Sequence, residues 1–175
     1  MTGDEREILI LEPIADHAEV GRWLSAMEDG RRDTLRELVD VDDEMVDRRV
    51  VDELNTIGTL LYHVALVEAD WLLDDIFGDR AAWPSDVLPF GDRDPKGVLT
   101  EVRGESLAEH LGRLASVRTL FLGRMRPMTV EDFHTPRARE RYDVSPAWVL
   151  HHLLQHEAEH RAHIAWLRDR QRAQG

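Results

Sequence analysis

The chain has no cysteine among its 175 residues. Disulfide bonds, thiolate-bound metals and cysteine nucleophiles are therefore excluded, and any thiol in its chemistry must come from a second molecule. No apolar run reaches the roughly 20 residues that a membrane-spanning helix needs. The stretch from Met1 to Ile8 is acidic and lacks the basic-then-apolar pattern of a signal peptide. We therefore expect a cytoplasmic protein that does not enter a membrane.

Positive charge is also scarce in this chain. Against 35 acidic residues there are 22 basic ones, which gives a formal net charge of −13. Binding to nucleic acid depends on clustered Lys and Arg that neutralise phosphates, so we expect no nucleic-acid partner. The single lysine, Lys96, in a chain rich in Arg, Ala and Asp is typical of a GC-rich bacterial genome.

Helical periodicity dominates the sequence, and no convincing alternating strand interrupts it. Asn55 or Thr56 can cap the second helix, a capping box opens the third at Ser106, and Ser145 can cap the fourth. We predict an all-α, single-domain protein (residues 1–175) that forms a four-helix bundle with long connecting loops and nearly antiparallel neighbours. The predicted helices cover about residues 14–39, 55–77, 106–125 and 146–170.

Two connections are long for a plain bundle, residues 78–104 and 126–143. Loops of this length are usually functional or disordered. Their placement fits a pocket that the loops cover at one end of the bundle. Residues for substrate contact are not fixed by spacing, although Tyr62, Tyr142 and Arg161 are candidates.

The most informative feature that is present is a cluster of histidines. Residues 151–163 hold five of the nine histidines of the chain. His156 and His160 lie four residues apart, so a helix points both imidazoles at one ion. At 100° per residue His160 falls inside the apolar stripe of this helix and His156 at its edge. Ionisable rings in such a stripe need partners, and a metal ion is one.

The second predicted helix offers a third imidazole. His63 interrupts its apolar stripe between Leu60 and Val67. A bundle can bring His63 against His156 and His160, which would make a three-histidine metal site with positions open for water or substrate. The alternative is that these histidines are neutral, hydrogen-bonded core residues.

Other residues of the histidine-rich helix are weaker candidates. His152 and His163 fall nearer its flank, where they can support the site or contact a substrate. Glu157 and Arg161 are further candidates, although Glu157 projects to another face and a solvated acidic position is the simpler interpretation. No glycine-rich phosphate loop, serine nucleophile elbow or paired-carboxylate motif is present, so no catalytic residue is assigned.

Two blocks of the chain resemble the DinB-like (DinB/YfiT) superfamily of metal-binding four-helix bundles. They are residues 55–71, from Asn55 to Trp71, and residues 145–161, from Ser145 to Arg161. The resemblance covers most of the chain and implies an up-down-down-up bundle, a homodimer and a divalent metal on His63, His156 and His160. The family often has Gly-Gln after its His-Arg pair, whereas this chain has Ala162-His163.

The resemblance leaves several functions open. Some relatives look like thiol-dependent transferases that use mycothiol or bacillithiol, and others look like metal-dependent hydrolases. We expect zinc or nickel, with iron or manganese as alternatives, and a small-molecule substrate. In a transferase the metal activates the thiol of a cosubstrate, whereas in a hydrolase it activates water and Glu157 or Asp70 serves as base. A non-catalytic, metal-binding dimeric module is the remaining alternative.

Overall fold

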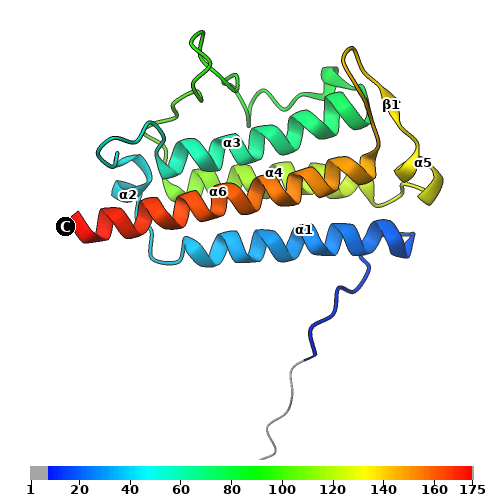
Figure 1. Ribbon diagram of the computed structural model, residues 1–175, viewed down its shortest axis with the longest axis horizontal. Helices are drawn as coiled ribbons and strands as arrows, with labels where there is room; N and C mark the ends of the chain where they lie inside the picture. The colour runs from blue at the N-terminus through cyan, green and yellow to red at the C-terminus, as the bar shows by residue number, and fades with distance from the viewer. Residues whose placement is uncertain (1–7, 175) are drawn as a thin grey trace, which may run out of the picture.

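A computed structural model describes residues 8–174, in which four long helices form a bundle (Figure 1). Helices α1 and α6 run in one direction, and α3 and α4 run in the other. The bundle is therefore of the up-down-down-up type (Figure 1). The expected antiparallel packing holds for α3 against α6, but α1 against α6 and α3 against α4 run parallel. The long helices are α1 (Ala18–Glu37), α3 (Ile57–Asp70), α4 (Leu107–Met125) and α6 (Pro146–Gln174).

The remaining elements are short and lie in the connections. They are α2 (Asp43–Asp47), the π-helical turn η1 (Trp71–Ile76), the 3-10 turn η2 (Arg80–Ala82), α5 (Val130–His134), and the paired strands β1 (Arg137–Ala138) and β2 (Asp143–Val144). The predicted helix over residues 55–77 includes η1, although as ordinary α-helix. The sequence did not predict the other short elements, because each is too short to show a period. In the part of the chain that the structure describes, no helix is long and apolar enough to cross a membrane.

Side-chain caps fix where the long helices begin. Thr56, rather than Asn55, accepts a hydrogen bond from the backbone N–H of Thr59 and starts α3. The predicted capping box is present at the start of α4, where Ser106 and Glu109 bond to each other's backbone. The three caps confirm the predicted starts of α3, α4 and α6, since Ser145 Oγ also accepts from a backbone N–H of α6.

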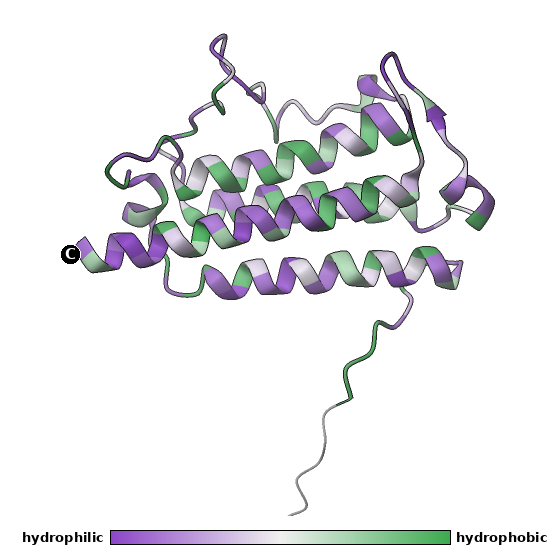
Figure 2. Cartoon of the chain, viewed as in Figure 1, coloured by the Kyte–Doolittle hydropathy of each residue, from purple (hydrophilic) through white to green (hydrophobic). Residues whose placement is uncertain are grey.

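The bundle interior contains two apolar clusters, one toward each end. Figure 2 shows the alternation of apolar and polar residues along the long helices that builds them. One cluster centres on α3, α4 and the carboxyl half of α6, and the other on α1, η1 and the amino half of α6. Most of α3 is buried, which is why its sequence reads as an almost continuous apolar run.

A layer of paired charges separates the two clusters. Each long helix contributes one buried residue to this charge layer: Arg31, Glu68, Arg118 and Glu157, all at most 7% exposed. Each arginine contacts both glutamates, at N–O distances between 2.6 and 3.2 Å. The hydroxyl of Thr34 donates a further hydrogen bond to Glu157. Burial alone would raise the pKa of Glu68, but Arg118 and Arg31 outweigh it and hold that pKa below its usual value.

Removing one charge from this layer should destabilise the fold. In the Glu68→Gln variant both arginines lose a partner, and we expect the free energy of unfolding at pH 7 to fall by about 3 kcal/mol. Urea denaturation measures the change. The control is Glu44→Gln, which removes an exposed i,i+4 pair with Arg48 and should cost less than about 1 kcal/mol.

Wild type and the Glu68→Gln variant also test how the stability of the fold depends on pH. Folding lowers the pKa of Glu68. The ionised carboxylate therefore contributes its full share of stability above the pKa that it has in the unfolded chain, and this share is lost as the pH falls toward the pKa in the folded protein. The stability difference between wild type and Glu68→Gln should therefore shrink as the pH is lowered below about 4, near the ordinary carboxyl pKa. A difference that stays constant down to pH 3 would contradict this assignment.

Candidate metal centre

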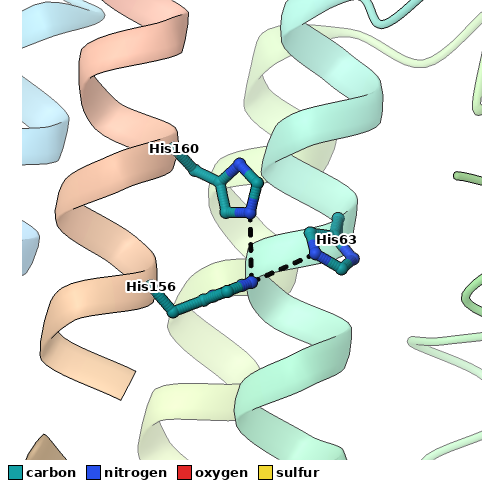
Figure 3. A group of neighbouring side chains, drawn as sticks. All are labelled: His63, His156 and His160. Carbon is teal, nitrogen blue, oxygen red and sulfur yellow. Dashed lines mark hydrogen bonds between the residues drawn. The ribbon is translucent and has the colours of Figure 1, made fainter. Parts of the chain in front are cut away.

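Helices α3 and α6 bring three histidines together on the side of the bundle where they face each other. His63 lies in the middle of α3 and is 7% exposed, whereas His156 and His160 lie one turn apart on α6 and are half-buried. Figure 3 shows the three rings pointing toward one another from the two helices. The expected convergence of His63, His156 and His160 is thus present in the fold.

The distances suit a single ion. Nε2 of His156 lies 3.1 Å from Nε2 of His63 and 3.1 Å from Nε2 of His160. One ring nitrogen from each residue lies within 4.8 Å of the others. Two nitrogens bound tetrahedrally to zinc are roughly 3.3 Å apart. The donor set and its spacing therefore fit a divalent metal ion.

Hydrogen bonding among the rings cannot account for this cluster by itself. Nδ1 of His63 lies 2.6 Å from Oδ1 of Asp92, and since a carboxylate only accepts, His63 carries its proton on Nδ1 and a lone pair on Nε2. Nε2 of His156 holds one proton or one lone pair, so it cannot both donate to His63 and accept from His160. A metal ion would remove the conflict by accepting a lone pair from each ring.

The environment keeps the three rings neutral, as metal ligation requires. Burial lowers the pKa of His156 to about 3, and the neighbouring His160 and His63 act in the same direction. Burial and His63 likewise lower the pKa of His160 to about 4. For His63 burial lowers the pKa more than Asp92 raises it. At neutral pH these rings offer lone pairs without first losing a proton.

Asp92 is a candidate site residue that the sequence did not reveal. It lies in the long connection after η2, and its second oxygen is 3.2 Å from Arg93 Nε. A carboxylate that accepts a hydrogen bond from a ligating histidine fixes the orientation of the ring and makes it a better donor. No periodic pattern marks Asp92, because its segment contains many Asp residues and no regular helix.

A hollow of about 530 Å³ lies over the three histidines. Asp92 and Arg93 form one wall, and Asp70 and Trp71 form another. Of the weaker candidates, His152 also lines this hollow, with its ring centroid 6.0 Å from that of His156. His163 lies further along α6, where its Nε2 is 3.5 Å from a carboxylate oxygen of Glu53.

The structure places the other two candidates elsewhere. Glu157 belongs to the charge layer, so the expectation that it is a solvated residue is wrong. It is buried, whereas His160, which the sequence placed inside the apolar stripe of α6, is only half-buried, as is His156 at the edge of that stripe. Arg161 donates to the backbone oxygen of Gly30 on α1, on a different side of α6 from His160. The burial of Glu157 was missed because a sequence pattern treats charged residues as exposed. A buried charge is tolerated when it is paired with an opposite one.

Comparison with known proteins agrees with this architecture. The sequence pattern of the DinB superfamily matches residues 26–164, which include all three histidines. The chain therefore belongs to the DinB superfamily. No curated protein matches the chain.

The first prediction for this site concerns the ligands. In the His156→Ala variant the affinity for zinc should fall more than about 100-fold, since one of three donors is lost. The control is His151→Ala, which removes an exposed histidine of the same helix. Elemental analysis of protein purified without a histidine tag, together with zinc titration, gives the affinity. Undiminished uptake after His63→Ala combined with His160→Ala would show that the metal binds elsewhere.

The second prediction concerns Asp92. Asn in its place keeps the size but lacks the charge, so Asp92→Asn should weaken zinc binding about 10- to 100-fold. Asp86→Asn is the matched control, because Asp86 lies exposed in the same connection. Competition with a chromophoric chelator measures the zinc affinity of both variants. Equal affinities for the two variants would rule out the orienting role of Asp92.

Proposed function

We propose that this protein is a divalent-metal enzyme that activates the thiol of a low-molecular-weight cosubstrate, of the mycothiol or bacillithiol type, and directs it to a small electrophile. The observation that carries the proposal is the convergence of three neutral imidazoles beneath an open hollow. Three protein ligands leave a coordination position for an exogenous group, which is typical of catalytic rather than structural sites.

His63, His156 and His160 would hold the metal, with zinc or nickel as first choice and iron or manganese as alternatives. A bound metal would lower the pKa of a thiol or a water molecule beside it. Asp92 keeps the His63 ring oriented, and the half-buried position of the rings limits access of bulk water. The sulfur lone pair would form the new bond to the electrophilic carbon while the bond from that carbon to its leaving group breaks and the leaving group takes the electron pair. The thiol proton would pass to solvent, so charge and atoms balance.

The surrounding carboxylates favour the transferase over the hydrolase. Glu157, the first candidate for a hydrolytic base, has both oxygens engaged by Arg31 and Arg118. Asp70 lines the hollow, but one of its oxygens accepts a hydrogen bond from Arg80. A thiol whose pKa is lowered needs no such base, whereas activation of water benefits from one. The lack of cysteine also fits a thiol that is supplied from outside.

Cobalt-loaded protein tests the proposal directly. Titration with a cellular thiol, with mycothiol and bacillithiol as the first probes, should produce a cobalt–thiolate charge-transfer band in the near ultraviolet. The His160→Ala variant at the same cobalt concentration should show no such band. The His151→Ala variant should behave like wild type.

The outcomes separate the candidate functions. Cobalt binding without a thiolate band for any cellular thiol would contradict the transferase. Ester or amide hydrolysis by that same protein would then identify the hydrolase, with Asp70→Asn as the variant that tests the remaining base. Cobalt binding with neither thiol binding nor hydrolysis would leave the non-catalytic metal-binding module.

A further inference from the structure

A second hollow, of about 460 Å³, lies beside the candidate metal centre at the end of the bundle. It is bounded by η1, by the first turn of α6 and by the segment that carries α5 and the β1–β2 pair, which Figure 1 shows together at one end of the molecule. Its main walls are the side chains of Trp71, Trp148, Tyr142, Pro136 and Val144. We call it the aromatic hollow.

The walls of the aromatic hollow are rings held in contact with one another. The ring centroids of Trp71 and Trp148 are 5.6 Å apart, and those of Trp71 and Tyr142 are 6.2 Å apart. Trp148 is nonetheless 49% exposed and Tyr142 is 47% exposed. Large aromatic surface that stays open around a concave site is typical of a binding pocket rather than of a core.

Two residues connect the aromatic hollow to the histidines. Trp71 lines both hollows. His152 stacks on Trp148, with centroids 5.2 Å apart and planes 12° apart, and it also lines the hollow over the metal ligands. The two hollows therefore share a boundary at Trp71, and the ring of His152 lies between the rings of Trp148 and His156.

The polar groups of the aromatic hollow select against an anion. None of the described residues that line it is Arg or Lys, and its carboxylate, Asp143, repels negative charge. His134 is held by Glu19, at an N–O distance of 2.7 Å. The hydroxyl of Tyr142 donates to Asp75, which raises the pKa of Tyr142 to about 12. The walls thus offer mainly aromatic faces, together with the exposed carboxylate of Asp143.

We propose that the aromatic hollow binds an uncharged aromatic group, or an apolar group of similar size, which belongs to the substrate whose reactive end lies over His63, His156 and His160. This inference rests on the proposed function for the role of the reactive end, but the aromatic hollow itself binds its group without a metal. Its volume lies within the range of small-ligand pockets, about 300–1,000 Å³. The substrate class is therefore a small electrophile with an uncharged aromatic or bulky apolar substituent.

The first test uses 2-naphthol and protein dialysed against a chelator, with binding followed by equilibrium dialysis. We expect saturable binding at one site and about tenfold weaker binding to the Trp148→Ala variant, since an aromatic wall is lost. Trp148→Phe keeps an aromatic face and should fall between the two. Trp166→Ala is the control, because Trp166 is a comparably exposed tryptophan of the same helix, at 39% exposure, outside the aromatic hollow.

The second probe, 2-naphthoate, has the same rings and a negative charge. It should bind about fivefold more weakly than 2-naphthol, since a carboxylate beside the exposed Asp143 costs about 1 kcal/mol. Equal binding of 2-naphthol to wild type and Trp148→Ala would overturn the proposal. Equal binding of the two probes to wild type would overturn the preference for an uncharged group.

A bifunctional probe tests the connection to the metal ligands. On cobalt-loaded protein, 4-phenylimidazole should bind more tightly than imidazole, and Trp148→Ala should remove most of that advantage while leaving imidazole binding unchanged. An advantage of the phenyl group that survives in Trp148→Ala would contradict the shared site. Failure to bind cobalt, with 2-naphthol binding still dependent on Trp148, would refute the proposed function and leave the aromatic hollow in place.

Discussion

The charge layer in the middle of the bundle is the constraint on which the rest of the structure depends. Arg31, Glu68, Arg118 and Glu157 come from four different helices, and each arginine contacts both glutamates. A helix that slid by one turn would leave a buried charge without its partners, which costs several kcal/mol. The layer therefore acts less as a source of net stability than as a penalty on wrong alignment, and it fixes the rotation of α3 and α6. With Glu157 turned inward, His156 and His160 are presented on the neighbouring flank, opposite His63 on α3.

Much of this arrangement could be predicted from the sequence. The four long helices show clear apolar periods and capping residues, and the three histidines stand out because ionisable rings interrupt those periods. The family assignment over residues 26–164 confirms the resemblance that two short blocks suggested. The burial of Glu157 was missed for one physical reason. Glu157 was placed outside the core because its partners, Arg31 and Arg118, are more than thirty residues away in the chain, and a local pattern carries no information about such pairs.

The same limit applies to the walls of the site. Asp92 lies in a segment without a period, and its contact with His63 follows from the path of the connection back along the bundle (Figure 1). The π-helical turn after Asp70 is also invisible to an analysis that assumes 3.6 residues per turn. There the N–H of Phe77 bonds to the oxygen of Leu72, five residues earlier. Such turns are frequent at functional sites, and this one carries Trp71, which lines both hollows.

The path of the two long connections has a consequence for how this architecture can diversify. The three histidines and the charge layer lie on the helices, whereas Asp92 and Tyr142 come from segments that connect them. The alignment of the bundle thus depends on the helices alone, whereas part of the walls of the site comes from the connections, so that replacing a connection alters those walls while the bundle keeps its alignment. Three histidines on two helices therefore fix where the nitrogen donors lie, and the chemistry that they can support depends on the residues that surround them.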